Sequence, residues 1–324
     1  MKGFYRQMKV ALAQRELILT LVILVLTGVI SLFSKYFLTS ANILSMFTAL
    51  TVEGIIVIGM TLLLIIGGLD LSVGAVMAFT GVLTAMMIKS GIPIALSIIL
   101  ALLAALVIGA VNGLLIAKAK LNSFITTLGM MMAVKGLMLV LSNGKAVPNM
   151  PAGFKMIGQS RILGLQLPIV IMIILVVGMD LFVRNSRIMR RNYYVGNNEL
   201  SAKLNGINVN AVKIATYCLS AFFAGIAGVL ITARFGSASV TLGDNTAMNV
   251  ITAAIIGGAS LNGGQGTILG AFLGATFMQL ISTSLNMLGV NMYWQNFATG
   301  AILIIAILID AINESRKAGK KSIS

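Results

Sequence analysis

Apolar runs of about 20 residues recur along the chain, and no other feature limits its fold as strongly. Such runs lie at 17–37, 41–67, 71–88, 92–117, 122–142, 163–183, 211–232, 246–262, 266–287 and 294–312. One helix of this length crosses roughly 30 Å of hydrocarbon. The run at 246–262 is short, so a tilted, broken or re-entrant segment stays open there. The sequence predicts an all-α polytopic membrane protein with about ten transmembrane helices.

The overall composition excludes a soluble enzyme. Of the 324 residues, 58% are hydrophobic and only 10% are charged, whereas about a quarter of an ordinary soluble domain is charged. The polar stretches 143–162 and 184–210 are too short to form a core of their own. We therefore expect a single membrane domain over 1–324.

The positions of the basic residues predict the orientation of the chain. With the N-terminus placed inside, the inner segments hold 16 of the 23 Lys and Arg, the outer segments hold 6, and Lys135 falls within a span. Cytoplasmic loops carry such an excess, so the net charge of +15 reports orientation rather than nucleic-acid binding. An odd span count would leave one basic end outside, which favours ten spans over nine or eleven. We expect cytoplasmic tails at about 1–16 and 313–324, and a retained first helix rather than a cleaved signal.

Few residues are available for catalysis. Histidine is absent and Cys218 is the single cysteine, which excludes His-dependent catalysis, a disulfide within the chain and Cys-based zinc sites. Five acidic residues fall in inner segments or near inner helix ends: Glu16, Asp180, Glu199, Asp310 and Glu314. The remaining acids, Glu53, Asp70 and Asp244, share no helical face, so paired-carboxylate and metal chemistry are not expected. Gly144-Lys145 lacks the rest of the Walker pattern, so no ATP site of that type is expected.

Two charged residues fall within predicted spans. An ionised Glu53 is costly there unless it faces protein or water, so it is either a path residue or a hydrogen-bonded structural acid. Lys135 is expected to extend its ammonium group to the outer interface.

Glycines predict both close helix packing and helix breaks. Small residues spaced by about one helical turn allow backbones to approach, with lining of a path as the alternative. They are Gly109, Gly113, Gly225, Gly228, Gly266, Gly270 and Gly274. The stretches 67–74 and 257–266 interrupt apolar runs at the predicted inner face, where such breaks line a cavity or form tight turns.

The inner loop at 184–213 is basic and contains a short predicted helix. Asn198 to Leu204 places Glu199 and Lys203 at i, i+4, and Gly206 is a plausible stop. This shape suits a docking site for a cytoplasmic partner, although composition alone also fits a simple positive-inside loop.

Four segments resemble one known family. They are GGLDLSVGAVMAF, VNGLLIAKAKLNSFITTLG, VGNNELSAKLNGINVNAVK and ITAAIIGGASLNGGQGTILGAFLGA. From about 40 to 312 the chain is similar to permease subunits of ATP-binding-cassette (ABC) importers for ribose, xylose, galactose and related sugars. The resemblance implies an importer permease bundle whose loop at about 184–210 couples to a cytoplasmic ATPase. The coupling residues that it implies are Gly196, Asn197, Asn198, Glu199, Ala202, Lys203, Leu204 and Gly206.

The sequence departs from the family pattern at this loop and at Lys135. In that family, Pro or Glu is typical where Asn198 stands, and Ala-Ala-Arg is typical where Ser201, Ala202 and Lys203 stand. Arginine is common where Lys135 stands. Lys203 and Lys135 keep the positive charge of the arginines that are typical there, so coupling to an ATPase is still expected. Which partner subunits pair with this chain stays open.

The resemblance also implies the partners and the place of action. An extracytoplasmic sugar-binding protein delivers substrate, two permease copies, identical or paralogous, enclose one path, and ATP and Mg²⁺ belong to the ATPase subunits. We expect a multi-pass protein of the bacterial plasma membrane, with no cofactor of its own, that moves a monosaccharide by alternating access.

Polar residues in or near the spans are the predicted path lining. They are Glu53, Asp70, Asn112, Asn122, Thr126, Thr127, Asn249 and Thr252. Two other functions stay open: a branched-chain amino-acid importer permease, and an ion-coupled secondary carrier that needs no ATPase.

Overall fold

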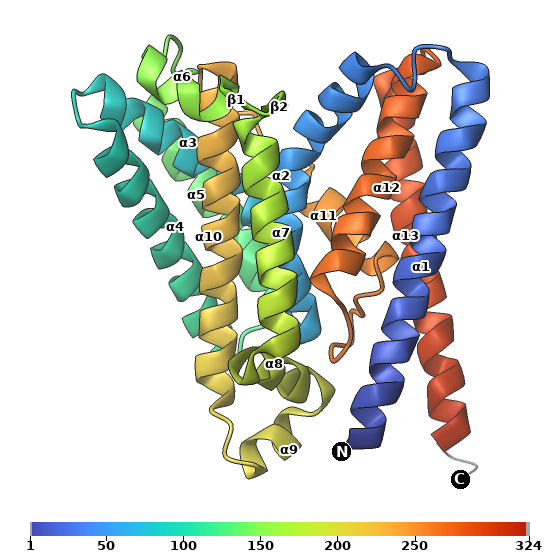
Figure 1. Cartoon of the computed structure of the whole chain (residues 1–324). Helices are drawn as coiled ribbons and strands as arrows, with labels where there is room; N and C mark the ends of the chain where they lie inside the picture. Colours follow the sequence, from blue (N-terminus) through green and yellow to red (C-terminus); the bar gives the residue numbers. More distant parts are fainter. Residues whose placement is uncertain (1, 322–324) are drawn as a thin grey trace.

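The computed structural model describes the backbone of residues 2–321 and the side chains of 15–291, 293–308, 310 and 312. Each predicted apolar run overlaps one helix (Figure 1). These helices are α1 (Lys2–Phe33), α2 (Ser40–Ile65), α3 (Val73–Lys89), α4 (Ile94–Ala117), α5 (Ser123–Ser142), α7 (Leu167–Asn185), α10 (Val209–Phe235), α11 (Thr246–Ile256), α12 (Ile268–Met287) and α13 (Met292–Lys321).

Over the described residues, seven of these helices are long and apolar enough to cross a membrane. The exceptions are α3, α11 and the apolar part of α13, which are shorter. With 11 residues, α11 is about 16 Å long and covers only half of the hydrocarbon core. The chain is therefore a polytopic all-helical membrane protein in which one apolar segment is a half-helix.

The remaining elements lie at the two ends of the bundle. They are α6 (Ala152–Gln159), a hairpin of β1 (Arg161–Ile162) and β2 (Leu165–Gln166), α8 (Arg187–Asn197) and α9 (Glu199–Leu204). Figure 1 places α8 and α9 at the end where the chain begins and finishes, and α6 with the hairpin at the other end. We call these the termini end and the hairpin end. The start of α1 and the end of α13 lie at the same end of the bundle (Figure 1).

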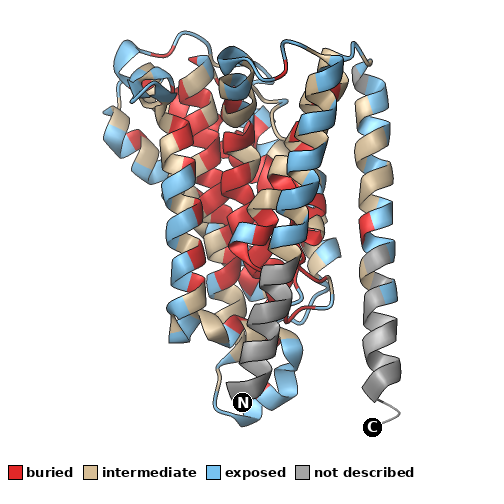
Figure 2. Cartoon of the chain, turned by 45° about the vertical axis from the view of Figure 1, so that its right-hand side comes forward, coloured by how far each residue is buried: buried red, intermediate tan, exposed pale blue. Residues whose placement is uncertain are grey.

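The core lies along α2 and α10, which are enclosed by the other helices. Figure 2 shows buried residues concentrated in the middle of the bundle and exposed ones on its outer helices. Outer helices present apolar side chains, such as Leu103 and Val107 of α4, which are 50% and 62% exposed. In a bilayer such surfaces contact lipid or another subunit, and their backbone hydrogen bonds are satisfied within the helix.

Glycines lie where helices come closest. A Cβ at Gly109 or Gly113 of α4 would lie within 3 Å of α10 backbone atoms, and one at Gly228 of α10 would lie 2.1 Å from the Met77 carbonyl of α3. Gly225 of α10 faces Leu102 and Ala105 of α4.

The predicted glycine stripe at the start of α12 is only partly helical. Gly270 and Gly274 of α12 meet the Gly257 and Ala253 carbonyls at the end of α11. Gly266 lies before α12, with a φ of +140° that favours glycine, so the predicted helical stripe begins at Gly270 instead.

Candidate functional site

A short helix forms the tip of the loop at the termini end. Asn198 caps α9 by accepting a hydrogen bond from the Ser201 N–H at 2.8 Å. The Gly206 N–H and the Ile207 N–H then bond to the Lys203 and Ala202 carbonyls, and Gly206 adopts a φ of +76°. The predicted helix from 198 to 204 and its glycine stop are confirmed.

Glu199 forms an ion pair with a residue outside this helix. Lys213 of α10, not Lys203, contacts Glu199 through an ion pair between Nζ and Oε1. Lys203 is exposed. The pair formed in the structure fixes α9 to the first turns of α10, so the tip of the loop is joined to a core helix.

An open groove of about 700 Å³ runs beside α9. It is lined by Lys120, Glu199, Leu200, Lys203, Gly206, Ile207, Asn208, Val209 and Asn210. Leu200 and Leu204 are 68% and 79% exposed, whereas Ala202 is buried in a cluster that includes Val195 of α8 and Tyr217 of α10. Exposed apolar side chains rimmed by charges are typical of a protein interaction site. We call Arg187–Leu204 with this groove the α8–α9 surface.

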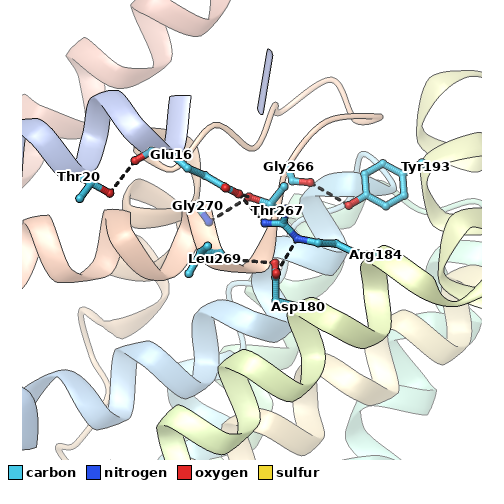
Figure 3. Close-up of polar contacts among 9 residues, drawn as sticks. All are labelled: Glu16, Thr20, Asp180, Arg184, Tyr193, Gly266, Thr267, Leu269 and Gly270. Atoms are coloured by element: carbon cyan, nitrogen blue, oxygen red, sulfur yellow. Dashed lines mark hydrogen bonds and ion pairs between the residues drawn. The ribbon is translucent and has the colours of Figure 1, made fainter. Parts of the chain in front are cut away.

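The two glycine-rich breaks meet each other and α8. The Gly264 N–H donates to the Ile65 carbonyl at 2.8 Å, and a Cβ at Gly196 would lie 1.8 Å from that carbonyl oxygen. Tyr193 of α8 donates from its hydroxyl to the Gly266 carbonyl at 2.9 Å (Figure 3). We call this meeting point of 65–68, 193–196 and 263–266 the glycine junction. Asn197 lies beside it and donates from Nδ2 to the Tyr193 carbonyl at 2.7 Å.

An irregular segment, 236–245, enters the bundle between α10 and α11. Ala238 of this segment pairs with Val147 at the hairpin end. Farther along, Gly243 packs against the first turn of α3, where a Cβ on Gly74 would lie 2.1 Å from the Gly243 carbonyl oxygen. From there the half-helix α11 continues toward the termini end. Irregular backbone within a membrane occurs only where protein encloses it or where it lines a water-filled cavity.

This segment pairs with Lys135 of α5. Nζ of Lys135 lies 2.6 Å from Oδ1 of Asp244, so the ammonium binds a carboxylate. The expected position of this ammonium at the outer interface stays a prediction. The two side chains are 42% and 54% exposed. They border a cavity of about 220 Å³ whose other walls are formed by Ala75, Ala78, Met131, Met138, Val240, Leu242 and Gly243. Charged groups at membrane depth normally face the bundle interior or water.

Glu53 and Asn249, both predicted for the path, meet within the bundle. Asn249 of α11 donates from Nδ2 to Oε1 of Glu53 in α2 at 2.7 Å. Thr252, one turn later in α11, is buried and bonds to the Met248 carbonyl of its own helix. The Glu53 carboxyl therefore has an amide partner that belongs to the half-helix.

Three other predicted path residues form a closed cluster. The Ser72 hydroxyl donates to Asp70 and accepts from Nδ2 of Asn112 at 3.1 Å, while Thr127 accepts from the Leu71 N–H. Asp70, Ser72, Asn112 and Thr127 are each fully buried. These groups connect the 66–72 break with α4 and α5.

The last two predicted path residues lie at the start of α5. Asn122 caps α5 by accepting from the Phe124 N–H at 2.9 Å, and Thr126 donates to the Asn122 carbonyl. Among the described residues, no group of three or more Asp, Glu or Cys side chains is arranged to hold a metal ion.

Sequence comparison relates the chain to membrane transport components. The family described as branched-chain amino acid transport system / permease component matches residues 41–307. The ribose import permease protein RbsC of Bacillus subtilis is 37% identical over 88% of this chain and 89% of its own length. The L-arabinose ABC transporter permease protein AraH of Azospirillum brasilense is 33% identical over 94% and 89%. The D-allose transport system permease protein AlsC of Escherichia coli is 32% identical over 87% of each chain. No solved structure matches the chain significantly.

Proposed function

Since this chain belongs to the permease family of bacterial ABC importers, we propose that it is the subunit through which a monosaccharide of the ribose, arabinose or allose type crosses the membrane. The chain is a transport component and not itself an ATPase. Its sugar relatives match it along nearly its whole length, which supports a sugar as substrate.

A cytoplasmic ABC ATPase docks on the α8–α9 surface. This surface carries the proposal, because exposed Leu200 and Leu204 lie beside charged residues around an open groove. The Glu199–Lys213 pair joins it to α10, and the glycine junction joins it to both helix breaks. Displacement of a docked ATPase is therefore transferred to core helices rather than absorbed by a loose loop.

The orientation of the chain in the membrane indicates where the other partners bind. The termini end faces the cytoplasm and the hairpin end receives a sugar-loaded binding protein. A second permease copy, identical or paralogous, completes the path. The basic inner segments support this orientation, with 16 of the 23 Lys and Arg on the cytoplasmic side.

The path passes the polar groups at membrane depth. Glu53 with Asn249, and Lys135 with Asp244, are the pairs that combine partial exposure with a position inside the bundle. A neutral sugar is recognised by such hydrogen-bonding groups together with apolar walls. Asp70, Asn112 and Thr127 lie behind this lining and stabilise the backbone conformation of the 66–72 break.

A branched-chain amino-acid permease is the second candidate function, because the description of the matching family names that substrate class. An ion-coupled carrier is less well supported. Such a carrier needs an acid site open to ions at a helix break, and Asp70 is enclosed there by Ser72 and Asn112.

The test is uptake of labelled ribose, arabinose, allose and leucine by cells that carry this permease as their only importer for these substrates. Each assay is repeated with the partner ATPase inactivated and with a protonophore. We expect sugar uptake that needs the ATPase. Uptake of leucine alone would establish the second candidate, and uptake that survives ATPase loss but not the protonophore would establish a carrier.

A further inference from the structure

A network of charged and polar groups joins three helices at the termini end (Figure 3). Arg184, in the last turn of α7, donates from Nε to Oδ2 of Asp180 at 2.6 Å and from Nη2 to Oε1 of Glu16 in α1 at 2.8 Å. Thr267, the cap of α12, donates to the same Glu16 oxygen at 2.6 Å. The Leu269 N–H donates to Oδ1 of Asp180 at 3.0 Å. We call these five residues the Arg184 network.

Arginine is specifically suited to the centre of this network. Two different nitrogens of one planar group hold carboxylates from two helices, an arrangement that the single ammonium of lysine does not reproduce. The side chains of Glu16 and Asp180 are only 13% and 12% exposed. Without the guanidinium, two poorly solvated carboxylates would lose their shared countercharge.

The network also supplies the start of α12 with hydrogen-bond partners. The first N–H groups of a helix have no partner within it and carry partial positive charge. Thr267 accepts from the Gly270 N–H at 3.0 Å, and Asp180 of α7 accepts from the Leu269 N–H. The first turn of α12 is thus held by a side chain of α7 and not only by its own cap.

The same point is connected to the α8–α9 surface. Arg184 lies two residues before Ser186, the residue that caps α8, so α7 continues almost directly into that surface. Tyr193 of α8 bonds to the carbonyl of Gly266, the residue just before Thr267. The start of α12 is therefore attached to the ends of both α7 and α8.

We propose that Arg184 is a positioning residue for transport, which fixes the end of α7 to α1 and to the first turn of α12 so that displacement of the α8–α9 surface moves these helices together. This attachment fixes the relative position of the helices because charge-assisted hydrogen bonds have a defined geometry. Apolar packing, in contrast, allows helices to slide past one another. This inference rests on the proposed function, because it assigns the route by which ATPase movement reaches α1 and α12.

The test uses the complete complex in proteoliposomes, with the partner ATPase and ribose-loaded binding protein. Labelled ribose uptake and ATP hydrolysis are measured together for Arg184→Gln, Arg184→Lys and Glu16→Gln. We expect assembled complexes that hydrolyse ATP but take up at least about fivefold less ribose per ATP, the lower range of coupling between distant sites. Arg184→Lys should show the same loss because a compact ammonium lacks the planar guanidinium that places separate nitrogens against the two carboxylates.

Two controls make the result specific. Lys118→Gln removes an exposed charge at the same end of the bundle, outside the network, and should leave the ratio unchanged. Glu16→Gln still accepts from Thr267 but loses the ion pair, so it tests the proposal even if Arg184→Gln fails to assemble.

The outcomes separate the two claims. A purely structural role for the network would lower uptake and hydrolysis in parallel, and an unchanged ratio in the assembled variants overturns this inference. Failure of the wild-type complex to couple uptake to ATP would instead contradict the proposed function itself.

Discussion

Lys135 of α5 and Asp244 of the segment 236–245 form an ion pair with 2.6 Å between Nζ and Oδ1, although 109 residues separate them in the chain. The two side chains are 42% and 54% exposed, so each charge has a partner at an open surface of the bundle and not in its buried core. The pair also ties the irregular segment to a spanning helix beside a cavity of about 220 Å³.

Removing the Asp244 charge should impair transport more than stability. Because both side chains are about half exposed, Asp244→Asn should change the free energy of unfolding by about 1 kcal/mol or less. Uptake should fall severalfold, since Lys135 is left unpaired on the proposed path. Thermal unfolding of purified protein and ribose uptake in proteoliposomes measure the two effects. Lys89→Gln, at the end of α3 away from the cavity, is the control, and normal uptake by Asp244→Asn would remove the pair from the path.

Gly206 should be needed for coupling because of its backbone conformation. Its φ is +76° and a Cβ there would meet nothing within 4 Å, so Gly206→Ala strains the backbone by about 1–2 kcal/mol without a clash. We expect ATPase stimulation by the loaded binding protein to be lost while the protein stays folded. Gly91→Ala carries the same strain, at a φ of +87° in open space at the hairpin end, and should retain stimulation. Equal loss in both variants would argue against a specific role for Gly206.

Leu204 should contribute to ATPase binding and little to folding. It is 79% exposed on the α8–α9 surface, and complete burial of a leucine side chain contributes about 1.5–3 kcal/mol. Leu204→Ser should weaken ATPase binding by roughly tenfold, a change of about 1.4 kcal/mol. Titration of the ATPase onto permease in nanodiscs measures the affinity. Leu163→Ser, at a 99% exposed site in the hairpin, is the matched control, and equal affinities would place the ATPase elsewhere.

Gly196 should be required for the glycine junction to close. A Cβ there would lie 1.8 Å from the Ile65 carbonyl oxygen and 2.6 Å from the Gly264 nitrogen, so Gly196→Ala must displace backbone. We expect a clearly lower melting temperature together with loss of uptake. Gly178→Ala is the comparison, because that glycine of α7 has nothing within 4 Å of its Cβ position. A helix-interior alanine there should stabilise the protein by roughly 0.5–1 kcal/mol, and a similar gain for Gly196→Ala would contradict the close contact.

Most of the helical architecture was predictable because it depends on local sequence. A run of about 20 apolar residues carries its own signal for a spanning helix, whatever the rest of the chain does. Asn198 and Gly206 likewise predicted both ends of α9, because a cap and a left-handed stop act within one turn. The shortness of the run containing α11 indicated an interrupted span for the same reason.

Pairing between distant residues was not predictable from spacing. Glu199 and Lys203 satisfy the helical i, i+4 rule, yet Lys213 of α10 lies closer to the Glu199 carboxylate and binds it. Glu16 and Asp180 look like ordinary inner-segment acids in the sequence, whereas in the structure they share one arginine. No sequence signal connects residues 168 positions apart, such as Glu16 and Arg184.

The sequence by itself determined that this chain enters a membrane, which segments form its helices and which loop presents a short capped helix at one end. Tertiary structure alone decided which charges neutralise one another, which glycines touch, and how α1, α7 and α12 are joined. The reason is physical: hydrophobic length and caps act over a few residues, whereas an ion pair depends on distances that exist only after the helices have packed.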